Sequence, residues 1–251
     1  MGLKGYRALN GLHSNISIPV QSTRNTIYTP DINAASTDSN PAFTAVTLTP
    51  TKFTGSTLIA KEMLYNTNSD VEAFIIDSLL KEIAYKIENM MLEKVLAGAT
   101  TKIGVSAITA VDWDDILAAE AAVDGYMLDS TSFVMTPAAR AALKATPKAT
   151  DAICGFICEG NEVNGYEARI SGVAAKDAIY FGDWGQLVLG TWGEGIEILV
   201  DPFTESRAGN VVVVASALVD AAVIQPDAFC VIKVNESSSS SDSSASSSSS
   251  L

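Results

Sequence analysis

The stretch SDVEAFIIDSLLKEIAYKIENMMLEKVLAG, residues 69–98, is the most strongly patterned part of this 251-residue chain. Its apolar side chains recur at spacings of three and four residues, which is the repeat of one face of an α-helix. Ser69 and Glu72 have the spacing of a capping box, and Gly98 is predicted to cap the last turn. At ~1.5 Å per residue such a helix spans roughly 42 Å, well beyond the usual ~11 residues. We therefore predict a long scaffold helix whose apolar stripe packs against a core.

The residues before this helix lack any helical pattern. Residues 11–57 are rich in Asn, Ser, Thr and Pro, and only 16–20 and 45–49 look like short strands. A stretch this long without a helix is rare in a compact monomer unless it has a purpose of its own. The sequence therefore predicts an arm and a loop that reach onto neighbouring subunits.

The residues after the helix alternate between short helices and strands. A helix is predicted over 112–125, and a second one begins at Thr136-Pro137, where Thr caps the helix and Pro occupies its first position. Glycines between 182 and 195 are predicted to form hairpin turns, because no Gly-Lys-Ser/Thr of a phosphate loop follows them. An α+β chain follows, with strands predicted at 132–135, 178–181, 186–189, 195–200, 210–216 and 228–234.

Composition and charge exclude several classes of protein. The net charge is −13, with 16 Lys and Arg against 29 Asp and Glu, which argues against a general nucleic-acid binder. The longest uncharged apolar run, residues 211–219, is too short for a membrane helix. Residues 1–7 have a basic start with no apolar segment of a secretory signal after them, so we expect synthesis in the cytoplasm. The three cysteines are expected to be reduced thiols.

The sequence predicts no catalytic residue, cofactor site or metal site. His13 is the single histidine, so Ser-His-Asp, Cys-His and His-rich metal sites have no support. Cys154 and Cys158 form only a lone Cys-x-x-x-Cys pair, which is weak evidence for zinc. Asp114 and Asp115 are adjacent on a predicted helix, where they fit its solvated face better than an acid-base pair.

The order of these elements resembles the major capsid proteins of tailed phages, of the Hong Kong 97 type. The run Asn40 to Phe53 looks like the family's Pro-containing loop exit and first long strand, and Gly182 to Gly190 is similar to its turn into the peripheral sheet. The other matching segments follow in the family's order: Glu62-Met63-Leu64, Ser69-Asp70, Leu96-Ala97-Gly98, Ile196 to Pro202, Gly209, Val219-Asp220 and Gln225 to Lys233.

The resemblance implies a Hong Kong 97-like capsid fold of the α+β class. Such a fold has an N-terminal arm, an extended loop, a long spine helix with a peripheral sheet, and an axial domain. The implied division is arm 1–25, extended loop 26–52, peripheral domain with spine helix 53–98, axial domain 99–185, return to the peripheral sheet 186–225, axial strand 226–234 and disordered Ser-rich tail 235–251.

The resemblance also implies a function that resides in interfaces. It implies a shell protein without catalysis that forms hexamers and pentamers, made in the host bacterial cytoplasm and located in the virion. The implied partners are the chain itself, portal, scaffolding and decoration proteins, and enclosed double-stranded DNA bound without sequence specificity; no membrane is implied. The candidate assembly residues are Ile27, Tyr28, Pro41, Phe43, Trp184 and Trp192.

The chain departs from the family pattern in two places. Many relatives have an Arg shortly before the position of Asp220, where this chain has Ala217-Leu218-Val219. Residues 26–51 contain no Lys, so the lysine-asparagine cross-links of some relatives are not inferred. Two other interpretations stay open: an encapsulin-type nanocompartment shell, which has the same fold but loads a cargo enzyme, and an unrelated enzyme or binding module.

Overall fold

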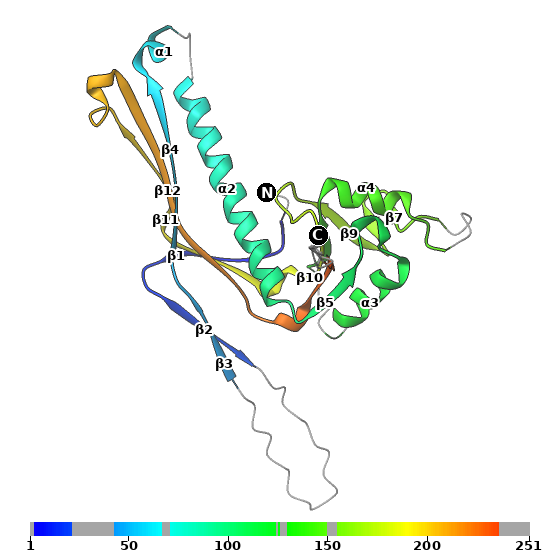
Figure 1. Cartoon of the computed structure of the whole chain (residues 1–251). Coiled ribbons are helices and arrows are strands. Elements are labelled where there is room, and N and C mark those ends of the chain that lie inside the picture. The colour runs from blue at the N-terminus through cyan, green and yellow to red at the C-terminus, as the bar shows by residue number, and fades with distance from the viewer. Residues whose placement is uncertain are drawn as a thin grey trace, which may run out of the picture.

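The computed structural model describes residues 3–21, 43–66, 71–123, 125, 130–149 and 155–235. Within them the chain forms a four-stranded sheet with a long helix, a seven-stranded sheet with shorter helices, and a pair of strands that extends away from both (Figure 1). The predicted α+β fold is confirmed. None of the described helices is long and apolar enough to cross a bilayer.

The long helix and the four-stranded sheet form one layered unit, here called the peripheral domain. Helix α2 runs over Val71–Gly98, so the predicted 28-residue helix is confirmed. The sheet has the strand order β1-β11-β12-β4, and α2 lies along its face (Figure 1). Its strands are β1 (Arg7–Leu12), β11 (Leu187–Asp201), β12 (Asn210–Val223) and β4 (Thr51–Ala60).

The core of the peripheral domain lies between α2 and the sheet. Alternate residues of β12 are buried there, among them Val213, Ala215 and Ala217, as expected for a strand with one covered face. The helix covers that face with the apolar side chains of its C-terminal half, including Ile87 and Met91. Burial of this shared apolar surface is the main force that holds helix and sheet together.

The seven-stranded sheet, with its helices, is here called the axial domain. Its strand order is β5-β13-β10-β6-β9-β8-β7. These strands are β5 (Thr101–Val105), β13 (Phe229–Val234), β10 (Ala178–Asp183), β6 (Thr131–Met135), β9 (Tyr166–Ile170), β8 (Glu162–Val163) and β7 (Cys158–Glu159). Helices α3 (Trp113–Val123) and α4 (Pro137–Ala145) pack on it. Helix α4 begins as predicted, because the Thr136 hydroxyl accepts a hydrogen bond from the Ala139 N–H.

The chain passes between the two domains at three places. Residues 99–100 join α2 to β5. After β10, a short 3-10 helix at Trp184–Gln186 leads into β11. After β12, a second one at Pro226–Ala228 leads back into β13. Trp184 is fully buried at this junction, its Nε1 donates to the Ser132 carbonyl at 3.0 Å, and its ring contacts Phe229 edge to face. The junction is therefore packed and hydrogen-bonded rather than a free linker.

Two strands form a separate two-stranded sheet, here called the projection. Strand β2 (Ile16–Gln21) pairs antiparallel with β3 (Phe43–Leu48), and Gln21 lies opposite Phe43. The projection extends away from the peripheral sheet (Figure 1). Its root packs on that sheet through Leu48 of β3 and Ile18 of β2. Most of the predicted extended loop, residues 22–42, lies outside the described residues.

Three local expectations differ from the structure. Strand β11 is continuous where two strands and a hairpin turn were predicted, because Gly193 and Gly195, with φ of 68° and 104°, form an irregularity within it. Gly98 is the last residue of α2, and its φ is not left-handed. It therefore does not cap the helix as predicted, and it packs against Val223. Strand β1 pairs with β11 of its own chain, although residues 1–25 were expected to reach outward.

The apolar stripe of α2 is only partly covered. Its C-terminal half is core, whereas Phe74 near the N-terminal end is exposed. Ser69, the predicted capping residue, lies outside the described residues. A short helix that was not predicted, α1 (Lys61–Asn66), connects β4 to this end of the domain.

Candidate assembly surfaces

The distal end of the peripheral domain carries exposed apolar side chains from four segments. The β11–β12 hairpin, the end of β4, α1 and the start of α2 gather there (Figure 1). The Lys61 N–H donates to the Gly209 carbonyl at 2.9 Å, which joins α1 to the hairpin. The exposed apolar residues, here called the tip patch, are Leu58, Met63, Phe74, Leu199 and Phe203, and Phe203 is 82% exposed. Leu58 and Leu199 pair with Val212 and Val214 and face away from α2, whereas Phe74 lies on α2 itself. The tip patch therefore has apolar residues on both sides of the tip, and exposed apolar groups of this kind are candidates for an interaction surface.

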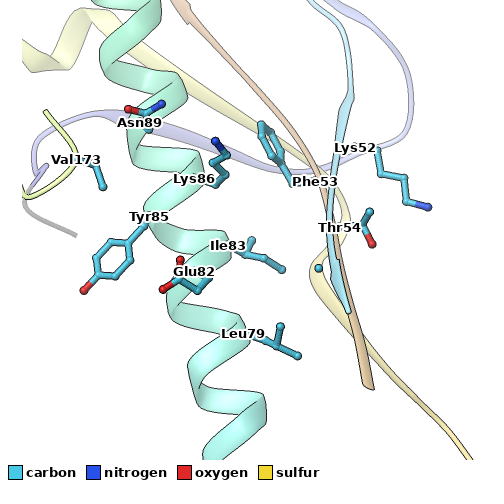
Figure 2. Close-up of a pocket in the computed structure, with 11 residues that line it drawn as sticks. Lys52, Phe53, Thr54, Leu79, Glu82, Ile83, Tyr85, Lys86, Asn89 and Val173 are labelled. Carbon is cyan, nitrogen blue, oxygen red and sulfur yellow. The ribbon is translucent and has the colours of Figure 1, made fainter. Parts of the chain in front are cut away.

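A groove separates the middle of α2 from β4. It has a volume of about 700 Å³. Figure 2 shows Leu79 and Ile83 pointing from the helix toward the strand, with Phe53 on the strand side. Lys86 and Glu82 stand on the same stretch of helix at the rim. The groove therefore has an apolar floor and a charged rim.

The root of the projection is held by a small apolar cluster. Leu48 of β3 is fully buried against Val188, Trp192 and Ala222 of the peripheral sheet. The Trp192 Nε1 donates to the Ser14 carbonyl at 3.0 Å, which fixes the chain just before β2. Beyond this root the strands have little cover, and Phe43 at the far end of β3 is 66% exposed.

Asp220 joins three elements beside this root. Its Oδ2 accepts the Thr49 N–H at 3.0 Å, and its Oδ1 accepts the Ala221 N–H at 2.9 Å. Lys94 of α2 lies 3.2 Å from Oδ1. Asp220 therefore forms an ion pair with a cation from α2, although no Arg shortly precedes it in the sequence.

A buried acid connects α2 to the axial domain. Glu88 is 2% exposed, and its Oε1 accepts a hydrogen bond from the Ser171 Oγ at 2.7 Å. The same Ser171 oxygen accepts the Val173 N–H at 3.3 Å. Sequence reasoning missed Glu88, although its position between Ile87 and Met91, inside the apolar stripe, could have marked it as buried.

Replacing Ser171 by Ala is expected to lower the free energy of unfolding by about 1–3 kcal/mol, because a buried carboxylate loses a hydrogen-bond donor. Chemical denaturation followed by circular dichroism measures this change. Ser132→Ala is the matched control: Ser132 is equally buried, but its Oγ has no partner among the described residues. If both variants lose the same stability, the Glu88–Ser171 bond is not what holds the two domains.

Two cysteines of the axial domain are buried thiols. Burial raises the pKa of Cys230 to about 11 and also raises the pKa of Cys158, so both thiols stay protonated near neutral pH. Both are buried and free, as predicted; Cys154 lies outside the described residues. Among the described residues, no group of His, Cys, Asp and Glu could hold a metal ion.

Glu120 on α3 is an acid in an unfavourable environment. Burial raises its pKa above the ordinary value, although the Asn164 side chain donates to its Oε2 at 2.7 Å and opposes this shift. Its Oε1 is buried with no hydrogen-bond partner among the described residues. The folded chain therefore holds this proton more tightly than the unfolded chain does.

We expect the Glu120→Gln variant to lack part of the acid-side pH dependence of stability. The pKa of Glu120 is higher in the folded chain than its unfolded value of 4.5, so protonated Glu120 contributes to the free energy of unfolding. This contribution is complete below pH 4.5 and is lost as the pH rises through the folded-state pKa. The variant should equal or exceed the wild-type free energy of unfolding at pH 7, with the advantage shrinking toward about pH 4. Urea titrations across this range measure the difference. A variant less stable at pH 7 than at pH 4, relative to wild type, would contradict the shift.

The structure places the candidate assembly residues in three different settings. Phe43 is exposed on the projection, whereas Trp184 and Trp192 are buried inside their own chain. Ile27, Tyr28 and Pro41 lie outside the described residues. Sequence reasoning missed the tip patch. Leu199 lies in the apolar run Ile198 to Val200, and a strand pattern alone does not show which face of such a run is covered.

The fold belongs to the Hong Kong 97-like class of capsid subunit. It has the three parts of that class: the peripheral domain with its long helix, the axial domain, which the chain enters twice, and the projection. The solved structures support this assignment. The capsid of a native GTA particle has a TM-score of 0.72 at 18% identity, over 92% of this chain and 88% of its own. A Microbacterium phage Oxtober96 structure has a TM-score of 0.72 at 14% identity, over 93% and 90%.

The sequence comparisons identify the family. The phage capsid family matches residues 6–234, and the chain belongs to that family. A major capsid protein of Halomonas phage phiHAP-1 is 24% identical over 249 residues, which cover 92% of this chain and 40% of that relative. The chain therefore spans about two fifths of the length of that relative.

Proposed function

We propose that this chain is the major capsid protein of a tailed phage and assembles into the icosahedral shell around the double-stranded DNA genome. Copies of the chain form hexamers and pentamers, and the protein resides in the virion. The observation that carries this proposal is the projection: two strands with almost no core of their own, on a chain of the phage capsid family. An isolated two-stranded sheet is marginally stable in water, so it needs a partner surface.

The projection and the tip patch supply the surfaces for this assembly. Strand β3 offers exposed Phe43, and the proposed extended loop continues from it with Ile27, Tyr28 and Pro41 as contacts to neighbouring subunits. The tip patch offers a second apolar surface at the opposite end of the peripheral domain. Trp184 and Trp192 act from inside the subunit, by holding the domain junction and the projection root.

The proposed division of the chain agrees with the sheets after α2, whereas β1 of the arm and the first residues of β4 in the loop belong to the peripheral sheet. The proposed segments are arm 1–25, loop 26–52, peripheral domain 53–98, axial domain 99–185, peripheral return 186–225, axial strand 226–234 and Ser-rich tail 235–251. It is supported by the membership of β11 and β12 in the peripheral sheet and of β13 in the axial sheet.

The proposed role is structural and not catalytic, and the proposed partners are those of a phage head. Portal, scaffolding and decoration proteins are expected to bind the assembled shell. The net charge of −13 suits a wall that encloses DNA without sequence-specific binding, because it does not retain phosphates.

Particles isolated from cells that produce the protein test this function. We expect closed shells that protect double-stranded DNA from nuclease. Shells of the same fold that contain a cargo enzyme and no DNA would contradict the phage-head assignment, and a soluble monomer would contradict assembly itself.

A further inference from the structure

We propose that Asp220 is a positioning residue that fixes the direction in which the projection leaves the peripheral sheet. Its importance for assembly rests on the proposed function. The contact itself is a property of the single subunit and does not depend on that function.

Asp220 lies where the projection departs from the sheet. Strand β4 pairs with β12 up to the pair Thr51 and Val219, and Asp220 is the next residue of β12. On the other side the chain continues through Pro50 and Thr49 into β3. Pro50 has no N–H and restricts Thr49 to extended conformations, so the Thr49 N–H is the first backbone donor beyond the sheet. That donor is bound by the Asp220 carboxylate.

The carboxylate is held from the other side as well. It is 5% exposed, and a buried charge is stable only when it is paired and hydrogen-bonded. The Ala221 N–H and Lys94 fix its second oxygen, and Lys94 belongs to the long helix. The Thr49 N–H is thereby tied to a group whose own position is set by β12 and α2.

Two other attachments hold the root of the projection. The hydrogen bond from Trp192 Nε1 to the Ser14 carbonyl holds the chain before β2, on the side of the other strand. The apolar cluster on the β3 side has less directional character. Leu48 is buried in an apolar cluster, and burial of this kind stabilises contact without imposing a direction. A hydrogen bond, by contrast, weakens steeply when its angle changes. The apolar cluster therefore holds the root in place, and Asp220 sets the angle at which β3 leaves the peripheral sheet.

Distance measurements on the unassembled subunit test this assignment. Spin labels on ketone-bearing residues at Thr44 of β3 and Ser78 of α2, both exposed, leave the native cysteines unchanged. Pulsed electron spin resonance gives the distribution of distances between them. The wild-type chain is expected to give one narrow distribution. In Asp220→Asn, where the amide cannot accept both N–H groups and pair with Lys94, the distribution is expected to become roughly twofold wider.

Asp77→Asn is the matched control, because it removes another acid–lysine pair of α2, Asp77–Lys81, which is exposed and lies away from the projection. Its distribution is expected to equal the wild-type one. An unchanged mean and width in Asp220→Asn would overturn the assignment. If that variant does not fold, Asp220→Glu takes its place under the same criteria, because it keeps the charge but moves the carboxylate away from the Thr49 N–H.

Shell yield separates this inference from the proposed function. A wider distribution together with fewer closed shells supports both. A wider distribution with normal shell yield supports the role of Asp220 and contradicts the proposed role of the projection in assembly. A distribution like that of wild type overturns the role of Asp220, whatever the shell yield is.

Discussion

Replacing Met91 by Asp is expected to leave no folded subunit. Met91 is fully buried between α2 and the peripheral sheet, in the cluster that also contains Ala215 and Ala217. A carboxylate there has no donor to replace water, and its burial costs several kcal/mol out of a total stability of about 5–15 kcal/mol. Soluble expression and far-ultraviolet circular dichroism measure the outcome.

Ser78→Asp is the control, because it adds the same carboxylate to an exposed position of the same helix. It is expected to fold like wild type. Met91 is a better position than Ile83 for testing the cost of a buried carboxylate. Ile83 lines the groove, so a carboxylate at that position could reach water. A soluble, folded Met91→Asp variant would show that the stripe of α2 is not the core of the peripheral domain.

Replacing residues 22–42 by an Asn-Gly turn is expected to separate folding from assembly. Gln21 and Phe43 are directly opposite in the register of β2 and β3, so a two-residue turn closes the hairpin without changing it. The replaced segment has no helical apolar stripe and few large apolar residues, so the core of a single subunit has little use for it. The shortened chain should keep the circular dichroism and melting temperature of wild type and stay as small oligomers in sedimentation.

Deletion of residues 237–251 is the control for this experiment. The tail is nearly pure Ser and cannot form a packed interface, so shells are expected to form without it. If the shortened chain still assembles into shells of normal size, the loop does not mediate assembly. If it unfolds, the segment belongs to the subunit core.

The sequence predicts best those elements whose signals are local. The length of α2 follows from its own apolar repeat, and the start of α4 follows from Thr136 and Pro137. Strand β11 was divided in the prediction, because Gly193 and Gly195 mimic a turn; only pairing with β12 on both sides of them shows a continuous strand. Glycine alone does not distinguish a bulge from a hairpin.

The contacts between distant segments were beyond prediction for a different reason. Nothing near Asp220 in the sequence indicates that Lys94 and the Thr49 N–H surround it, since these groups meet only after the sheet and helix have packed. The burial of Trp192 likewise depends on the return of β11 beside β1. A tryptophan near a turn is equally compatible with a surface contact and with a core, and pairing of the strands decides between them.

The most direct test of self-assembly is the particle mass of the purified chain, measured by sedimentation velocity with electron microscopy of the same sample. We expect closed shells in equilibrium with hexamers and pentamers. A single species of 26.3 kDa at every concentration would contradict it.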